Sequence, residues 1–218
     1  MKSKFIDKYP YLGSLAWILT AQYLIITLIV ARSWNTTYSF LHNSISDLGN
    51  TACRTYSNRY VSNIYVCSPK HTLMNWSFAV TGILMIIGAI LIYTLFKKSR
   101  STMIGFTCIA LGGIGGILVG LYPENTIGTL HVTGAFLDFF VGNLGIVILG
   151  MSLLTPKWLR MYTLITGFLT LICLILYSSK IYLGLGLGGM ERLASYPQTV
   201  WLIVFGFYLL IVRTRETK

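Results

Sequence analysis

Six apolar segments, each close to or above the length needed to cross a bilayer, constrain this chain more than any other feature. A helix of about 20 apolar residues spans the roughly 30 Å of hydrocarbon in a membrane. The segments cover residues 11–31, 72–96, 102–121, 130–154, 161–183 and 200–212. The sixth is short, so we expect its helix to begin earlier, around residues 194–197, after a flexible or closely packed turn formed by Gly184, Gly186, Gly188 and Gly189. The sequence therefore predicts an all-α, polytopic membrane protein: a six-transmembrane-helix bundle.

The composition excludes the soluble and the disordered classes of protein. Hydrophobic residues make up 55% of the 218 residues and charged residues only 11%. The first value is too high for an ordinary soluble domain, and the second is too low for a disordered chain. The residues between the apolar segments are too few for a separate soluble domain, so residues 1–218 are expected to form a single integral membrane domain.

The basic residues predict the orientation of the bundle, because lysine and arginine accumulate in short cytoplasmic loops. With both termini cytoplasmic, eleven of the 17 basic residues fall inside: Lys2, Lys4, Lys8, Lys97, Lys98, Arg100, Lys157, Arg160, Arg213, Arg215 and Lys218. The long loop 32–71 then lies outside. The net charge of +11 fits this topology and contact with anionic membrane lipids. Nucleic acid is not expected as a partner, because the basic residues are scattered over short loops.

Two cysteines in the outer loop, Cys53 and Cys67, lie fourteen positions apart. In an oxidising exterior this spacing favours a disulfide, which would contribute about 3 kcal/mol on the chain-entropy model. A pair of free thiols or a metal-binding pair is the competing interpretation.

A polar break between the third and fourth apolar segments, residues 122–138, carries the strongest indication of function. It contains Glu124, His131 and Asp138. His131 and Asp138 are seven residues apart, two helical turns, and so project from one face. Four small residues share that face: Gly134, Ala135, Gly142 and Gly145. An acid inside a membrane helix is costly and is by default a functional-site hypothesis. The alternative is that Asp138 only forms a hydrogen bond with a neighbouring helix.

A second polar cluster follows the first apolar segment, in the motif HNSISDLGN at residues 42–50. His42, Ser46, Asp47 and Asn50 are its candidate site residues. Read alone, the motif could be a helix cap or a turn, since Ser and Asp side chains accept backbone N–H groups. The functional interpretation is strengthened by the other ionisable residues, because every histidine and most acids of the chain are predicted on the same side of the membrane.

The residue types in these clusters suit two kinds of chemistry. His42, Asp47 and His131 could bind a divalent metal such as zinc, with Ser46 or a bound water as the nucleophile. Without a metal, His42, Ser46, Asp47, Glu124, His131 and Asp138 could supply a nucleophile and general acids and bases. The sequence contains no compact HxxxH or HExxH motif, so any such site must be assembled from separate loops.

Four further residues are candidates for binding the substrate: Asn50, Asn125, Glu191 and Arg192. Arg192 could hold an anionic headgroup, because its planar guanidinium matches phosphate. Alternatively, Glu191 and Arg192 could pair with each other, which contributes little if the pair is exposed.

Three motifs carry a resemblance to a known family. They are HNSISDLGN, then YPEN at residues 122–125 followed by His131, and GGMERLASYPQTVW at residues 188–201. Together they resemble a prokaryotic family of six-span membrane proteins of unknown function. The ISD-x-G element is also distantly similar to the Frag1/DRAM/Sfk1 group. The resemblance implies six helices in a prokaryotic plasma membrane and work on lipids, since that group is tied to lipid remodelling; it carries over no catalytic residue. The segment 51–70 makes the outer loop longer than is typical of that family.

Three functions remain open at this stage. The first is a hydrolase or transferase that acts on a lipid or lipid-linked substrate in an extracytoplasmic polar pocket. The second is a non-catalytic protein that binds lipids and organises the membrane. The third is a small transporter with Asp138 as a proton or cation relay, which lacks support from an inverted repeat.

Overall fold

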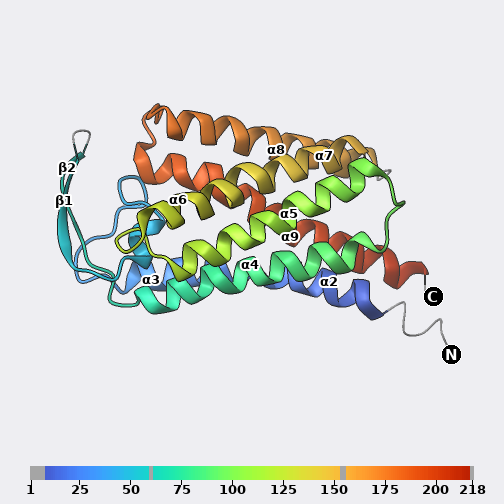
Figure 1. Ribbon diagram of the computed structural model, residues 1–218, viewed down its shortest axis with the longest axis horizontal. Coiled ribbons are helices and arrows are strands. Elements are labelled where there is room, and N and C mark those ends of the chain that lie inside the picture. The colour runs from blue at the N-terminus through green and yellow to red at the C-terminus, as the bar shows by residue number, and fades with distance from the viewer. Residues whose placement is uncertain (1–7, 59–60, 153–155, 217–218) are drawn as a thin grey trace.

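A computed structural model describes residues 8–58, 61–152 and 156–216, and it shows one elongated bundle of helices (Figure 1). The helices are α2 (Lys8–Leu19), α3 (Ala21–Arg32), α4 (His71–Tyr93), α5 (Arg100–Leu121), α6 (Gly128–Phe136), α7 (Asn143–Ser152), α8 (Lys157–Ser178) and α9 (Gly186–Glu216). Within the described residues they form six helices long and apolar enough to cross a membrane. The prediction of an all-α membrane protein with six spans is confirmed.

Two of the six spans are interrupted. The first is divided at Thr20, whose hydroxyl donates to the carbonyl of Trp17 at 2.6 Å, a local bond that competes with the helical pattern. In the fourth span, α6 and α7 are joined by the π-helical turn η2 (Leu137–Gly142). π-Turns inside α-helices are rare and are frequent at functional sites.

The last helix begins much earlier than predicted. It starts at Gly186, whereas the sequence interpretation placed its beginning around residues 194–197 and took the preceding glycines for a turn. The glycines serve a close approach instead. The loop before the 3₁₀ turn η1 (Ser46–Gly49) crosses the first turn of α9, and the Gly188 N–H donates to the carbonyl of Leu41 at 2.8 Å. A side chain at Gly188 would collide with the carbonyl of Asn43.

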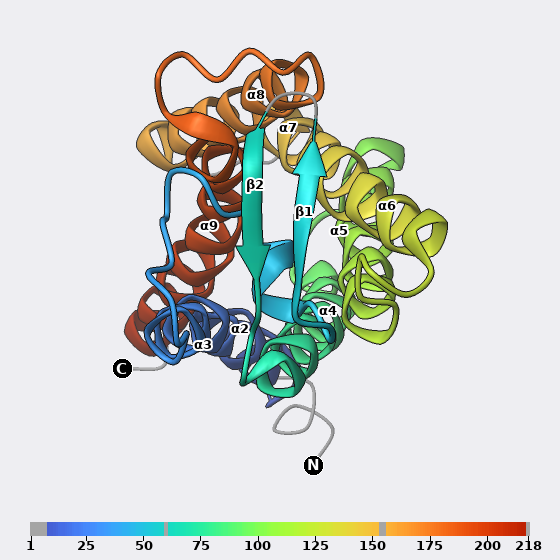
Figure 2. The same cartoon turned by 90° about the vertical axis from the view of Figure 1, so that its left-hand side faces the viewer.

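The spans pack in the order of the chain, and α9 closes the ring against α2 (Figure 2). One half of the ring interior is filled by large side chains. Trp17, Phe106, Trp201 and Phe205 are buried there, with the Trp17 and Trp201 rings 5.4 Å apart. This aromatic core occupies the half of the bundle that is distant from the long loop, and the other half contains a cavity.

Helix α5 is held to its neighbours on both sides by contacts between backbones. A Cβ at Gly113 would stand 2.5 Å from the carbonyl of Gly82 on α4, and a Cβ at Gly134 on α6 would stand 2.7 Å from the carbonyl of Gly115. Only glycine permits such an approach, as is common between membrane helices. The glycines of α5 therefore serve the packing of this helix against its neighbours.

The long loop contains the only strands of the described residues. β1 (Arg54–Asn58) and β2 (Val61–Val66) pair antiparallel and stand at one end of the bundle, the hairpin end (Figure 2). A disulfide joins Cys53 and Cys67 at the base of the hairpin, as predicted. The start of α2 and the end of α9 lie at the opposite end (Figure 1). Which end faces the cytoplasm stays a prediction.

Candidate functional site

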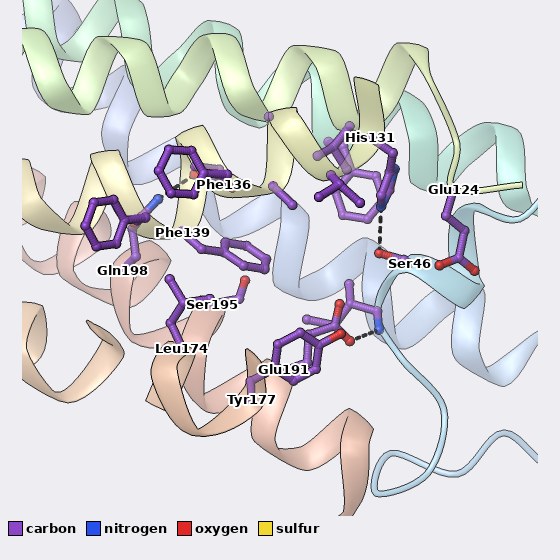
Figure 3. A pocket seen from close by; sticks show the side chains of 18 of the residues that line it. Ser46, Glu124, His131, Phe136, Phe139, Leu174, Tyr177, Glu191, Ser195 and Gln198 are labelled. Carbon is purple, nitrogen blue, oxygen red and sulfur yellow. Dashed lines mark hydrogen bonds between the residues drawn. The ribbon is translucent and has the colours of Figure 1, made fainter. Parts of the chain in front are cut away.

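The interior of the ring at the hairpin end holds a cavity of about 570 Å³ (Figure 3). Side chains of α3, α4, α5, α6, η2, α8 and α9 line it, and the 3₁₀ turn η1 (Ser46–Gly49) closes its outer end. Its walls are mostly apolar, with residues such as Phe78, Val119, Phe139 and Leu174. Polar groups gather at two places, an outer cluster next to η1 and an inner pair deeper among the helices.

The turn η1 is fixed by its own sequence. Ile45 and Leu48 are three residues apart, so a 3₁₀ turn places both on one side, and both are almost fully buried. Ser44 and Asp47 form a reciprocal cap: the Ser44 N–H donates to Asp47 Oδ2 and the Asp47 N–H donates to Ser44 Oγ, both at 2.9 Å. The capping interpretation of this motif is therefore correct for Asp47, and the cap leaves Ser46 directed into the cavity.

Ser46 and His131 point toward each other at the outer end of the cavity (Figure 3). Ser46 Oγ lies 3.0 Å from His131 Nε2, and His131 Nδ1 lies 2.9 Å from the backbone carbonyl of Tyr122. A carbonyl oxygen can only accept, so Nδ1 carries a proton, and in the neutral imidazole Nε2 is then the acceptor for the Ser46 hydroxyl. A hydroxyl, an imidazole that can accept its proton and a carbonyl that orients the imidazole are thus in contact, an arrangement that could support covalent catalysis.

Glu124 lies at the same end of the cavity and shares a hydrogen bond with Asp47, behind it. Burial, reinforced by the charges of Asp47 and Glu191, raises the pKa of Glu124 to about 8, and burial also raises the pKa of Asp47. Two adjacent buried carboxyl groups cannot both ionise easily, so the pair retains a proton at neutral pH. Asn50 donates to Glu124 Oε1 at 3.3 Å and fixes its position. Glu124 is therefore a hydrogen-bond donor or acid at neutral pH.

Glu191 and Arg192, at the start of α9, both hold the loop. Glu191 is buried, lines the cavity and accepts the Ile45 N–H at 2.6 Å (Figure 3). Arg192 donates to the carbonyls of Phe40 and Asn43 at 2.9 and 3.0 Å, and its second terminal nitrogen donates to the Tyr38 hydroxyl. The Arg192 guanidinium is buried among backbone carbonyls, so its role is structural and it is not available to a headgroup.

The inner pair consists of Asp138 on η2 and Gln198 on α9, both of which line the cavity. Gln198 Nε2 donates to Asp138 Oδ1 at 2.6 Å. The π-turn that presents Asp138 is supported by Asn143, whose amide donates to the carbonyl of Phe139 at 2.8 Å. The hydroxyl of Thr170 on α8 in turn donates to Asn143 Oδ1 at 2.7 Å. These side chains satisfy groups that the irregular turn would otherwise leave unpaired in a membrane span.

The cavity opens sideways between α6 and α8. Val132 and Phe136 on α6 and Ile175 on α8 line it, and their side chains are also 67%, 55% and 62% exposed on the outer face of the bundle. All three belong to spans, so this face contacts acyl chains when the helices cross a bilayer. The cavity can therefore receive a molecule directly from the hydrocarbon of the membrane.

Most of the predicted site residues come together here. Ser46, Glu124, His131, Asp138 and Glu191 line the cavity. Asp47 and Asn50 lie behind Glu124 and bond to it.

Three predicted residues lie elsewhere. His42 is exposed on the loop and does not line the cavity, and Asn125 forms an exposed contact with Thr51. Arg192 is buried against the loop and donates to its carbonyls, as described above. Over residues 8–58, 61–152 and 156–216, no three His, Cys, Asp or Glu side chains gather as a metal site would require, so the expected metal set of His42, Asp47 and His131 is wrong. His42 lies exposed on the loop, next to Gly186.

Ser195, Gln198 and Tyr23 are among the cavity residues that the sequence interpretation missed. Glu191, Ser195 and Gln198 follow the helical spacing i, i+4, i+7, which places them on one face. Had the last helix been started at Gly186, this polar face would have been visible in the sequence.

Comparison with known proteins gives one match. No curated protein and no solved structure is detectably similar to this chain. The model of a family described as protein of unknown function (DUF998) matches residues 18–208, which include four of the six spans in full, most of the first and sixth spans, and every cavity residue named above. The similarity to the Frag1/DRAM/Sfk1 group and the prokaryotic origin stay predictions. Since the match covers most of the sequence, this membrane protein with its cavity at the hairpin end belongs to the DUF998 family.

Proposed function

We propose that this protein is a hydrolase or acyltransferase of the extracytoplasmic membrane face, which acts on a lipid ester with Ser46 as nucleophile and His131 as base. The observation that carries the proposal is the chain of contacts from Ser46 Oγ through His131 to the carbonyl of Tyr122. This chain fixes the histidine tautomer that can accept the serine proton. The lateral opening between α6 and α8 supports a membrane lipid as the substrate.

The reaction follows from these groups. Ser46 Oγ attacks the ester carbonyl while its proton moves to His131 Nε2, and the C–O bond to the alcohol then breaks as Nε2 returns the proton to the leaving oxygen. Water, or the hydroxyl of an acceptor, repeats these steps on the acyl group and regenerates Ser46. Glu124 keeps its proton near neutral pH, in a hydrogen bond to Asp47, and stands on the cavity wall beside Ser46 (Figure 3). During the reaction this proton would have to turn from Asp47 toward the developing oxyanion to stabilise it.

The test uses the purified protein in detergent micelles with a fluorophosphonate that carries an alkyl chain. We expect it to label Ser46, as located by peptide mass spectrometry. In parallel, incubation with phospholipid and acylglycerol esters should release fatty acid, or transfer it to an added alcohol. Replacing Ser46 by Ala or His131 by Gln should lower both rates by at least about 10³-fold, as for other serine–histidine sites.

Ser195→Ala is the matched control, because Ser195 lines the same cavity without an imidazole partner; its hydroxyl lies 3.3 Å from that of Tyr23. This variant should keep most of the labelling and the activity. The proposal is refuted if the unchanged protein is neither labelled nor active on any ester, or if Ser195→Ala is as damaging as Ser46→Ala.

A lipid-binding protein without catalysis is the second candidate. It is favoured by the mostly apolar walls of the cavity, which could hold an acyl chain without any reaction. In that case the alkyl fluorophosphonate would leave Ser46 unmodified, while native mass spectrometry would still detect a retained lipid. Transport is tested separately, by ion or proton flux in proteoliposomes with the Asp138→Asn variant.

A further inference from the structure

The ionisable side chains that line the cavity are acidic, with one exception. They are Glu124, His131, Asp138 and Glu191. Among the residues that the structure describes, no lysine or arginine lines the cavity. The chain nevertheless carries a net charge of +11, so the cavity has the opposite character to the sequence as a whole. A ligand meets carboxyl groups there and no basic side chain.

Two of the acids lie at the outer end of the cavity, next to the proposed nucleophile. Glu191 is 3% exposed, and it accepts the N–H of Ile45, the residue before Ser46, at 2.6 Å. Glu124 stands on the cavity wall beside Ser46 (Figure 3) and shares a proton with Asp47. Since one proton neutralises only one of those two carboxyl groups, the pair keeps a negative charge at neutral pH. The outer end is therefore negative even before Glu191 is counted.

Two basic residues are neighbours of cavity residues in the sequence, but neither places its charge in the cavity. Arg192 follows Glu191 and attracts it, yet its guanidinium is held in hydrogen bonds to backbone carbonyls of the loop before η1. Lys180 comes directly after Ser179, a cavity residue, and its side chain is exposed. A buried carboxylate is costly unless positive charge lies close to it. A cation in the cavity itself would supply that charge.

Aromatic rings form much of the remaining wall. Phe78 and Phe139 line the cavity among the helices, and Tyr177 lies next to Glu191 (Figure 3). The face of an aromatic ring is negative, so it attracts a cation, most strongly where water is excluded. It offers no such attraction to the oxygens of a phosphate or a sulfate. The ring faces and the carboxyl groups thus favour the same ligand charge.

We infer that the cavity binds a lipid with a positively charged group, an amine or a quaternary ammonium, and that Glu191 selects this charge at the outer end. The apolar walls and the opening between α6 and α8 favour a lipid over a free amine in water. A lipid with an anionic group would bring a like charge to the same carboxyl groups. The inference adds a substrate class to the proposed function and rests on that proposal for the position of the polar group near Ser46.

The experiment compares three ligands that share one alkyl chain and differ in charge. Dodecylamine, dodecanol and dodecyl sulfate compete with an uncharged fluorescent alkyl lipid for the purified full-length protein, in micelles of an uncharged detergent present in large excess. We expect dodecylamine to bind about 10-fold more tightly than dodecanol, as a close charge pair implies, and dodecyl sulfate to bind most weakly. Ethylamine, which has the charge without the chain, should not compete at the same concentration.

Glu191→Gln tests the residue assignment, because glutamine retains an oxygen that can accept the Ile45 N–H and removes the charge. The advantage of dodecylamine over dodecanol should fall by at least about 3-fold, while dodecanol binds as before and so reports an intact cavity. The matched control is Glu216→Gln, which removes an acid at the last residue of the same helix, at the opposite end of the bundle (Figure 1). This variant should retain the full preference, and so should Asp138→Asn, which alters only the inner pair.

Four results would overturn the inference: equal binding of the three ligands, tightest binding of dodecyl sulfate, competition by ethylamine equal to that by dodecylamine, or a preference that persists undiminished in Glu191→Gln. If Glu191→Gln does not fold, the order of affinities in the unchanged protein still decides. A charge preference without ester turnover refutes the proposed reaction alone, and turnover with equal binding of the three ligands refutes the inference alone.

Discussion

Replacing Glu124 by glutamine tests how the buried carboxyl pair of Glu124 and Asp47 makes the stability of the protein depend on pH. In the folded protein, burial and the neighbouring acids raise the pKa of Glu124 from its ordinary value of 4.5 to about 8. Between these two pH values the folded state keeps a proton that the unfolded state has lost. The contribution of the group to stability is therefore complete below about pH 4.5 and is lost as the pH rises to about 8.

The magnitude follows from the same pKa. Each pH unit within this range changes the free energy of unfolding by about 1.4 kcal/mol, and by half as much at the folded pKa itself. Between about pH 6 and pH 8 the loss is about 2 kcal/mol, provided that the carboxyl group stays buried when it ionises. For a chain of this size that corresponds to about 4–8 °C in the unfolding temperature.

The assay is thermal unfolding in detergent micelles, followed by tryptophan fluorescence at the two pH values. Glutamine retains an oxygen for the Asn50 amide and donates permanently to Asp47, so Glu124→Gln should lose most of the pH dependence. Glu216→Gln, at the last residue of α9, is the control and should behave like the unchanged protein. If Glu124→Gln shows the same pH dependence as the unchanged protein, the buried carboxyl pair is not the origin of the effect.

Three further predictions concern the parts that hold the site. Replacing both Cys53 and Cys67 by serine should destabilise the hairpin by about 3 kcal/mol and speed hydrogen exchange there with little change in the helices; unchanged exchange would contradict this. Gly115→Ala places a methyl group against the carbonyl of Gly134 and should lower the unfolding temperature, at a cost of about 1–3 kcal/mol, whereas an unchanged temperature would mean that the two helices separate freely. Arg192→Met leaves the buried carbonyls of Phe40 and Asn43 without donors and should lower the free energy of unfolding by about 3 kcal/mol in the same melting assay. Arg192→Lys should recover only part of this stability, and full recovery by lysine would argue against the role of the guanidinium in holding the loop.

The six spans could be predicted because length and hydropathy alone decide whether a helix crosses a bilayer. The disulfide was predicted from compartment and spacing, and the structure contains it. The start of the last span was wrong because glycines before Glu191 suggested a turn. In the fold they are helical, since the loop backbone packs directly against them, and no local sequence rule contains that contact.

The site was partly predictable for a related reason. Glu124, His131 and Asp138 stand out as ionisable residues in apolar surroundings, and the structure places all three at the cavity. The partner of each was not predictable: His131 meets Ser46 across 85 residues and Asp138 meets Gln198 across 60. Such pairs depend on how the ring of helices closes. His42 looked equivalent to His131 by residue type, yet it lies exposed on the loop, because burial and not chemistry separates the two.

The glycine contacts of α5 determine which wall of the cavity can yield. Gly113 and Gly115 bring α5 against the backbone carbonyls of Gly82 on α4 and Gly134 on α6, and a contact with a backbone carbonyl cannot be relieved by a change of rotamer. Helix α8 meets its neighbours through ordinary side chains such as Leu164 against Gly150, which can shift. Under the proposed function, entry of a bulky lipid would therefore move α8 while α4, α5 and α6 stay in place. Cross-linking α8 to α6 should then prevent lipid entry without altering the packing of α4, α5 and α6.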